Sequence, residues 1–441
     1  MKQKNYFNLL LVLGCVLAQP EILFAQNEAA DAAKQVAAKE EISLESLVSQ
    51  ALEKNPELNF YKSEIAVAKG ERRTAGTYPN PELSADIGRK RASGGGLSVE
   101  GTAWSVSVQQ PFEYPGRLAL RKAIANRQID LAEIGYAQFR AALMARVRTL
   151  GFGLGVAQRK AAAAERVAQR GQELAEVIVQ RDPAGITPLL ETRIIEGSVI
   201  VAKRRAALAA RDAQVALYEL NQLRGVPLSW PISVAASDLK FPKPIAVEAL
   251  VAAARTNNFE IRSREMELAQ QGLRVDLTKN ERWPTVTAGP FYSQEKASEK
   301  ERVMGVGISM PLPLWNRNAG NIEAAQARTQ QAEAAFFVTL RQVERDVRER
   351  AAAYNAFVDQ MSFWRTNSLD QLREAAELGD RHYRLGSLPV ATYVELQDKF
   401  IEATEAILDT QRDAMESQQQ IQLLTGQPTS SASANTTDEK K

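Results

Sequence analysis

Residues 104–127 read WSVSVQQPFEYPGRLALRKAIANR, and this stretch decides the fold of the chain. It ends a segment of alternating apolar and polar residues, turns on prolines and a glycine, and opens a long helical run. A related stretch returns about 200 residues later, where residues 304–328 read MGVGISMPLPLWNRNAGNIEAAQAR. The residues of the two predicted strand-to-helix turns are Pro111, Pro115, Gly116 and Arg117 in the first copy and Pro311, Pro313 and Arg317 in the second. The chain is therefore a tandem duplication.

The composition limits the functions that are open to this chain of 441 residues. Lys plus Arg number 55 against 53 Asp plus Glu, and a net charge of +2 gives no basis for nucleic-acid binding by bulk electrostatics. One His and one Cys leave the chain poorly equipped for a metal site, a Ser/His/Asp triad or a disulfide framework. We therefore expect no enzyme activity, no catalytic residues, and no cofactor or metal.

The first residues are typical of an export signal. Lys2 and Lys4 supply positive charge, an apolar run follows from Phe7 to Ala18, and a cleavage site after Ala25 would make residues 1–25 a signal peptide. The apolar run is shorter than the roughly 20 residues that a membrane-spanning helix needs. A second possibility stays open, because residues 12–15 resemble a bacterial lipobox, and a lipidated Cys15 would then be the mature N-terminus.

Each half of the mature chain begins with a short amphipathic helix and a further helical segment. The apolar stripe of the first is Leu44, Leu47, Val48, Ala51 and Leu52, which Val247, Leu250, Val251 and Ala254 copy in the second half. The predicted segments are a flexible lead over residues 26–42, a first repeat over 43–228, a linker over 229–245, a second repeat over 246–426 and a disordered tail over 427–441.

The next segments of each half alternate with a period of two. Leu83, Ala85 and Ile87 alternate with polar or small residues, and three further segments do the same. Strands of roughly ten residues suit a tilted crossing of a bilayer, with apolar side chains toward lipid and small polar ones toward a lumen. A soluble antiparallel sheet with one solvated face fits the pattern equally well, and the export signal favours the barrel. Four strands cannot close a barrel, so other copies must complete it. Three chains would give about twelve strands.

Long helical hairpins follow the strands in both halves. The first runs out over residues 117–182, turns at residues 182–188 and returns to residue 224. The second runs out over residues 318–385, turns at residues 386–389 and returns to residue 424. Tyr393, Phe400 and Ile407 recur every seven residues, which predicts coiled-coil packing. A helix of about 65 residues is roughly 100 Å long, which suits the wall of a tube.

These features together resemble the TolC-type outer membrane efflux family. The turns QPFEYPGR and MPLPLWNR, the helical tips AGITPLLETR and RLGSLPVATYVELQ, and the order of elements over residues 43–426 carry the resemblance. The stretches ALEKNPEL and TYPNPEL are most similar to the heavy-metal and cation-resistance branch. The family implies a mainly α fold with a β-barrel portion, in which long antiparallel helical hairpins form an α-barrel. Four strands per chain would contribute to a trimeric twelve-stranded barrel in the outer membrane of a Gram-negative bacterium.

The resemblance also implies the function and the partners. A homotrimer in outer membrane lipid would extend into the periplasm, meet a periplasmic adaptor of the membrane fusion type, and receive metal cations or drugs from an inner-membrane pump of the RND type. The chain would conduct these substrates passively. Two alternatives stay open, namely the outer membrane duct of a type I secretion system and an exported coiled-coil scaffold without channel activity.

The resemblance places the periplasmic gate and the adaptor contacts at the helical tips. The gate candidates are Asp380, Arg381, Tyr383 and Arg384 in the second half and Asp182 and Arg181 in the first. The candidate adaptor contacts are Gly185, Thr187, Pro188, Gly386, Leu388 and Pro389. In a trimer, one carboxylate per chain would form a ring that attracts cations and raises its own pKa by mutual repulsion. For any one of these charges, an ordinary salt bridge or a solvated helix surface is the competing interpretation.

Overall fold

The computed structural model describes residues 41–94, 97–181, 189–234, 241, 246–297, 299–364 and 368–426. The chain divides into two compact units, which we describe separately. Unit 1 comprises residues 1–51, 147–240 and 367–412, and unit 2 comprises residues 52–146, 241–366 and 413–441. The expected signal peptide, the candidate lipidation site Cys15 and the tail over residues 427–441 lie outside the described residues.

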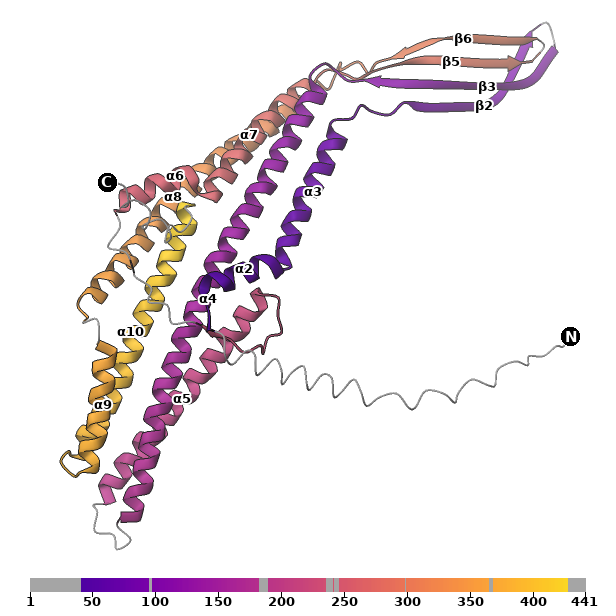
Figure 1. The fold of residues 1–441 in the computed structure, drawn as a ribbon. Helices are drawn as coiled ribbons and strands as arrows, with labels where there is room; N and C mark the ends of the chain where they lie inside the picture. The colour runs from indigo at the N-terminus through magenta and orange to yellow at the C-terminus, as the bar shows by residue number, and fades with distance from the viewer. Residues whose placement is uncertain are drawn as a thin grey trace, which may run out of the picture. The chain divides into compact units, whose positions relative to one another are not determined.

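The element order repeats between the two halves (Figure 1). The first half contains β1 (Glu41–Ile42), α2 (Leu44–Lys54), α3 (Glu57–Ala75), β2 (Glu82–Gly94), β3 (Leu97–Phe112), α4 (Arg117–Arg181), α5 (Leu189–Leu223) and β4 (Ser233–Val234). The second half contains α6 (Val247–Asn257), α7 (Phe259–Asn280), β5 (Val286–Lys296), β6 (Lys300–Ser309), α8 (Ala319–Ser362), α9 (Ser368–Arg384) and α10 (Val390–Thr425). The long helices α4 and α10 contribute residues to both units.

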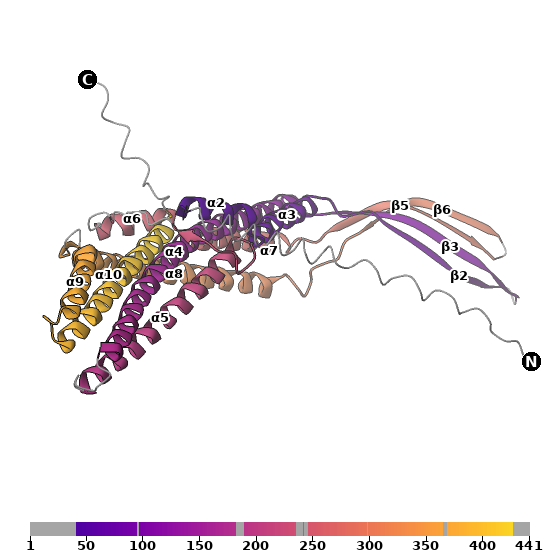
Figure 2. The ribbon, with the colours of Figure 1, turned by 60° about the horizontal axis from the view of Figure 1, so that its bottom comes forward.

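Unit 2 contains a four-stranded sheet in the order β2-β3-β5-β6, and all of its neighbouring strands are antiparallel. The central β3·β5 pairing joins the two repeats, with Val106 opposite Tyr292. Figure 1 shows both strand hairpins turning at one end of the sheet, while all four strands connect to helices at the other end. Figure 2 shows the four strands arching together. The predicted hairpins are therefore present, and the sheet has open edges at β2 and β6.

The helical part of unit 2 is held by an apolar cluster among α6, α7 and α8. Val251, Ala254, Ile261, Val343 and Val347 form this cluster, and a second one contains Ala351, Tyr354 and Ile421. Tyr354 is fully buried, and this burial raises its pKa to about 12 because the phenolate would lose its hydration. Burying these side chains is the main favourable contribution to the fold of this region.

Unit 1 contains helical hairpins in which α5 lies beside α4 and α10 beside α9 (Figure 2). The predicted heptad is confirmed, because Tyr393, Phe400 and Ile407 are all buried. Phe400 and Ile401 pack against Ala163 and Val167 of α4. The small side chain of Ala163 lets the backbones of α4 and α10 come close together. The coiled coil predicted from the sequence is thus the core of unit 1.

One predicted helix differs from the structure. The periodicity predicts a single outgoing helix over residues 318–385, whereas the structure has α8 and α9 with a break between them. The Phe363 N–H donates to the Gln360 carbonyl, which closes α8 with a tight turn, and the Ser362 hydroxyl donates to the Asp359 carbonyl at 2.6 Å. Serine favours helix ends over helix interiors, which fits the start of α9 at Ser368.

Candidate functional site

The two faces of the sheet differ in polarity. One face carries Leu83 and Ile87 of β2, opposite Val108 and Trp104 of β3. The apolar side chains of this face that are exposed are Leu83, Ile87, Trp104, Val106, Val108, Met304, Val306 and Ile308. The other face carries mostly small and polar residues, and its large apolar residues include Val99, Phe291 and Val303. On this face the Ser105 hydroxyl donates to the Asp86 carboxylate at 2.9 Å. A wide, exposed apolar face of this kind needs an apolar environment.

A charged cluster lies near the hairpin end of the sheet. The Lys90 ammonium is 2.6 Å from the Glu295 carboxylate and 2.9 Å from that of Glu301, on two different strands. Lys90 pairs with Gly101 on the intervening strand, where a Cβ would collide with the backbone carbonyl of Lys296, so glycine at this position permits the close approach of β5. The cluster ties three strands together at the end of the sheet away from the helices.

The first strand-to-helix turn is held by a buried arginine. Arg117, the first residue of α4, is 8% exposed and donates to the carbonyl oxygens of Asn280 and Trp283 and to the side chains of Asn280 and Thr285. Gly116 precedes it with a φ of +89°, a conformation that favours glycine. Pro115 offers its carbonyl oxygen to the Asn280 amide at 3.0 Å. Pro111 is the last but one residue of β3, opposite Thr287. The turn predicted from the sequence therefore fastens the first repeat to the α7–β5 junction of the second.

The second turn is built differently. Pro311, Pro313 and Arg317 lie between β6 and α8 and are exposed, and Arg317 forms no hydrogen bond or ion pair with any residue that the structure describes. The left-handed backbone position is Asn318, with a φ of +63°, and its amide donates to the Thr278 carbonyl at 2.9 Å. The matching prolines thus occupy similar places, but the first turn is fastened by the buried Arg117 and the second by the amide of Asn318.

At the tip of unit 1, the structure brings Asp380 and Arg384 together. The Arg384 Nε donates to Asp380 Oδ2 at 2.9 Å, and the same guanidinium lies 3.6 Å from the Glu173 carboxylate of α4. The Asp380 side chain is only 16% exposed. Arg381, the neighbouring gate candidate, is exposed and has no ion-pair partner in the described parts of the chain. Asp380 is therefore engaged within its own chain, and Glu173 is a partner that the sequence did not indicate.

Two tyrosines pack beside this ion pair. The rings of Tyr383 and Tyr393 stack with centroids 5.1 Å apart. Burial raises the pKa of Tyr393, and the nearby charge of Asp380 raises it further. Neither the Tyr393 hydroxyl nor Asp380 Oδ1 has a hydrogen-bond partner within the described ranges. Burial, followed by the charge of Glu191, raises the pKa of Tyr383 as well. The tip therefore holds a buried phenol beside a carboxylate, a contact that only the fold reveals.

The turn between α9 and α10 has a helix-ending geometry. Gly386 has a φ of +74°, its N–H donates to the Tyr383 carbonyl, and the next N–H donates to the His382 carbonyl, which is the hydrogen-bond pattern of a Schellman cap. Leu388 packs against the buried Leu174. Pro389 directly precedes α10 and accepts its first hydrogen bond. Of the other predicted tip residues, Asp182, Gly185, Thr187 and Pro188 lie outside the described residues, and Arg181 is described only as the last residue of α4.

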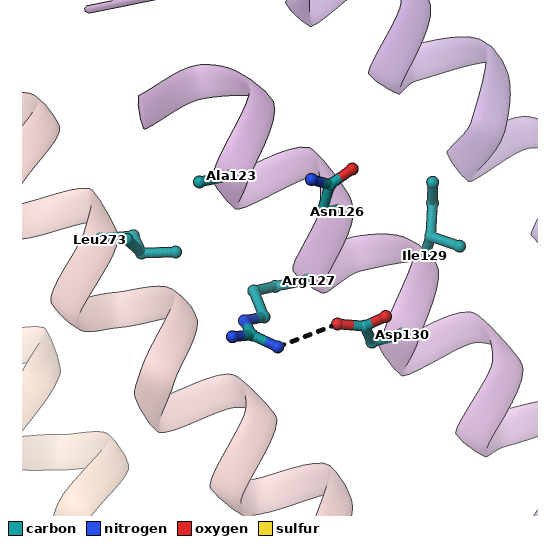
Figure 3. A pocket seen from close by; sticks show the side chains of 6 residues that line it. All are labelled: Ala123, Asn126, Arg127, Ile129, Asp130 and Leu273. Carbon is teal, nitrogen blue, oxygen red and sulfur yellow. Dashed lines mark hydrogen bonds and ion pairs between the residues drawn. The ribbon is translucent and has the colours of Figure 1, made fainter. Parts of the chain in front are cut away.

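A groove of about 480 Å³ lies in unit 2 between α4 and α7 (Figure 3). Its lining residues are Ala123, Asn126, Arg127, Ile129, Asp130 and Leu273. The Arg127 guanidinium is 3.1 Å from the Asp130 carboxylate one turn along the same helix, as Figure 3 shows. Asn126 accepts a hydrogen bond from Arg72 of α3 at 2.6 Å. The charges of this groove are thus paired within α4, and the hydrogen bond to Asn126 links α4 to α3.

The family model named "outer membrane efflux protein" matches residues 47–226 and 250–427, one copy for each repeat. The chain belongs to this family. In sequence, the efflux protein is 26% identical over 342 residues to the cobalt-zinc-cadmium resistance protein CzcC of Cupriavidus metallidurans, covering 74% of this chain and 77% of that one. It is also 26% identical over 301 residues to the nickel-cobalt-cadmium resistance protein NccC of Alcaligenes xylosoxydans xylosoxydans, covering 65% and 64%.

Solved structures share the fold of the efflux protein. A crystal structure of CusC matches with a TM-score of 0.69 at 15% identity, covering 87% of this chain and 92% of that one. The Campylobacter jejuni CmeC outer membrane channel matches with a TM-score of 0.70 at 15% identity, covering 87% and 85%. The predicted fold class, helical hairpins with a smaller set of barrel strands, is therefore confirmed. Among the described helices, none has an apolar stretch long enough to cross a membrane.

Family membership confirms the predicted function, outer membrane efflux, and the predicted location in the outer membrane. The efflux protein is a component of the outer membrane of Gram-negative bacteria that extends into the periplasm. Members of the family are the outer membrane parts of tripartite systems that also contain an adaptor and an inner-membrane pump. Family and fold are those of channel proteins.

Proposed function

We propose that this protein is a homotrimeric channel that passively conducts metal cations across the outer membrane. The observation that carries the proposal is the sheet, which has one exposed apolar face and an opposite face made mostly of small and polar residues. Such a sheet is stable in a bilayer only when it closes on itself with other copies, because unpaired edges are not tolerated in hydrocarbon. Three copies of this four-stranded sheet would give twelve strands.

The named activities of the relatives favour metal cations over drugs as the substrate. CzcC and NccC are named for resistance to cobalt, zinc, cadmium and nickel. In this proposal an inner-membrane pump of the RND type delivers the cations through a periplasmic adaptor. Deletion of the gene should therefore lower the Zn²⁺, Co²⁺ and Cd²⁺ concentrations that the cells tolerate. If the deletion left metal tolerance unchanged and lowered drug tolerance, drugs would be the favoured substrates instead.

The gate in this proposal is the ion pair at the tip of unit 1. Arg384 neutralises Asp380 and also approaches Glu173, so it holds α9 against α4 within one chain. Release of Arg384 would expose a carboxylate to the lumen, where three copies together attract cations. Tyr383 acts as the apolar part of this latch because it packs against Tyr393. Arg381, Asp182 and Arg181 remain further candidates in the same region.

The adaptor contacts in this proposal are the turns that end the helical hairpins. Gly386 and Pro389 fix the α9–α10 turn, and Leu388 fastens it to the apolar cluster beneath. Gly185, Thr187 and Pro188 would complete the contact from the first repeat. A rigid turn presented by two packed helices is a suitable docking element because little conformational entropy is lost on binding.

Cell fractionation tests this function. Trimers that resist heat in detergent and stay in the outer membrane fraction after a salt wash are the expected result. Protein that leaves the envelope in the salt wash would contradict the proposal and favour the coiled-coil scaffold. Stable trimers that carry a secreted polypeptide and leave metal tolerance unchanged would favour the duct of a type I secretion system.

A further inference from the structure

A pocket of about 210 Å³ lies within unit 1, between α4, α9 and α10. Much of its wall is apolar and buried, formed by Ala163 of α4 and by Phe400 and Leu408 of α10. Leu369, near the start of α9, is half-buried and also lines it. None of its described lining residues is a gate candidate or an adaptor-contact candidate. The pocket is therefore a separate feature of the helical part of the chain.

One buried hydroxyl in the wall has no hydrogen-bond partner. Thr404 of α10 lines the pocket, is 6% exposed, and its hydroxyl oxygen is unpaired within the described residues. The same helix shows how such a hydroxyl is commonly satisfied, because the Thr410 hydroxyl donates to the Ala406 carbonyl at 2.8 Å. A buried polar group that stays unpaired is costly. A ligand that accepts a hydrogen bond from Thr404 would remove this cost.

An arginine side chain lies along the edge of the pocket. The Nε of the exposed Arg166 donates to the Ala162 carbonyl one turn earlier on α4 at 3.0 Å, and both residues line the pocket. This hydrogen bond uses one of the five N–H groups of the guanidinium. In the described parts of the chain no carboxylate forms an ion pair with Arg166. Its two terminal nitrogen groups are therefore available to an anion.

The other charged residues of the lining have bonds within the chain. The Arg373 guanidinium is 2.9 Å from the Asp370 carboxylate on the same helix, and the Arg159 Nε donates to the Gly155 carbonyl at 3.3 Å. Three arginines and one aspartate line the pocket, so positive charge exceeds negative charge among the lining residues. This balance favours an anion, and Arg166 is the residue placed to pair with it.

We propose that this pocket binds a carboxylate that carries an apolar body of about ten carbons. The carboxylate pairs with the Arg166 guanidinium and accepts from the Thr404 hydroxyl, while the apolar body lies against Phe400 and Leu408. Guanidinium and carboxylate groups match in shape and form paired hydrogen bonds. The pocket is smaller than the roughly 300 Å³ at which sites for drug-sized ligands begin, which limits the size of the body. Apolar walls disfavour a fully polar anion such as phosphate, because its lost hydration would not be replaced.

Fluorescence titration with naphthoate, a carboxylate on a ring system of about ten carbons, tests the site. The probe is added to the full-length protein in a nonionic detergent, with the detergent alone as the blank. We expect saturable binding at one site per chain and a higher melting temperature in the presence of the probe. Neutral naphthamide and plain acetate should each bind at least about tenfold more weakly, because one lacks the charge and the other lacks the apolar body. Equal binding of either compound would overturn the proposed ligand class.

Three variants locate the bound probe. Arg166→Gln should weaken binding at least about tenfold, because it removes the charged donor. Thr404→Val should weaken binding about threefold or more, while stability without the probe stays equal or rises, because the hydroxyl has no partner to lose. Ala162→Phe should fill the pocket and abolish binding without removing a charge.

Two matched controls lie outside the pocket. Thr410→Val on the same helix and Arg193→Gln, which removes an exposed ion pair with Glu196 of α5, should both bind the probe like the wild type. Thermal unfolding followed by circular dichroism shows which variants are folded. Undiminished binding in folded Arg166→Gln or Ala162→Phe would overturn the site, as would a wild-type protein that shows no saturable binding. Either result would leave the proposed channel standing, because conduction does not require this ligand.

Discussion

The Arg117 guanidinium donates a hydrogen bond to the Trp283 carbonyl oxygen at 2.7 Å, and so ties the start of α4 to the loop that precedes β5. Replacing Arg117 by Ala should leave the Trp283 carbonyl without its side-chain donor and remove one of the two donors of the Asn280 carbonyl. Buried groups without hydrogen bonds are costly, so we expect a loss of about 2–4 kcal/mol in the free energy of unfolding. Thermal unfolding in detergent, followed by circular dichroism, measures it.

The exposed counterpart provides the control for that experiment. Arg317→Ala removes a guanidinium that has no bonded partner among the described residues, so the stability of one chain should change by less than about 0.5 kcal/mol. Equal losses in the two variants would show that the buried hydrogen bonds of Arg117 do not determine its effect.

The second prediction concerns the buried carboxylate of Glu344. Its side chain is 6% exposed and accepts from Arg255 at 2.6 Å and from Arg341 at 3.3 Å. The hydrogen bond from Arg255 lowers the pKa of Glu344. A lowered pKa in the folded state means that this stabilisation is complete above the ordinary glutamate pKa and is lost as pH falls through the folded-state value. The melting temperature should therefore fall on acidification, and by less in Glu344→Gln.

Removing the main partner of Glu344 tests the same interaction at neutral pH. Arg255→Ala leaves a buried carboxylate with weaker partners, and we expect a loss of about 1–3 kcal/mol. Arg264→Ala on the following helix removes an exposed i,i+3 pair with Glu267 and should cost less than about 0.5 kcal/mol. A larger loss of stability from Arg264→Ala than from Arg255→Ala would contradict the claim that burial of Glu344 makes its ion pair the stronger one.

The third prediction concerns the hydroxyl of Tyr393, which is buried beside Asp380 without a hydrogen-bond partner in the described chain. Tyr393→Phe removes this unsatisfied group, so stability at neutral pH should stay equal or rise by up to about 1 kcal/mol. The raised pKa of Tyr393 also means that the unfolded chain loses this proton first above its ordinary pKa, near pH 10. Stability should thus decline less steeply on the alkaline side in the variant.

The exposed Tyr218 is the control for removing a tyrosine hydroxyl, because it is 42% exposed. Tyr218→Phe should leave the neutral stability unchanged. If Tyr393→Phe destabilises the protein at pH 7 by more than about 1 kcal/mol, its hydroxyl has a partner that the structure does not show.

The fourth prediction concerns the latch at the tip. Arg384→Ala frees the carboxylates of Asp380 and Glu173, so the constriction should open more often and favour cations more strongly. Single-channel recordings in planar bilayers would show a higher open fraction. Arg373→Ala, which removes an exposed ion pair with Asp370 earlier in the same helix, should behave like the wild type. Identical recordings from both variants would show that Arg384 is not part of the gate.

Local periodicity predicted much of this fold. The alternation around Leu83 and Val106 predicted the strand hairpins, and the seven-residue spacing of Tyr393, Phe400 and Ile407 predicted the helix pairing. These patterns are visible in the sequence because each depends on neighbouring residues of one element. The sequence also predicted the first turn, where proline and glycine restrict the backbone directly.

Contacts between segments that are distant in the chain were harder to predict from the sequence. The partner of Arg384 on α4, Glu173, carries no periodic signal and is brought close only by the packing of separate helices. The break between α8 and α9 was missed because the helical periodicity continues on either side of it. The β3·β5 junction was likewise absent from the prediction, since strand order depends on the whole sheet.

Conductance of the detergent-extracted wild-type protein in a planar bilayer tests the central claim most directly, with its oligomeric mass measured on the same sample. The account predicts steady conductance that favours cations, from a particle of three chains. A trimer that binds the bilayer without conducting ions, or a soluble particle that does neither, would contradict it.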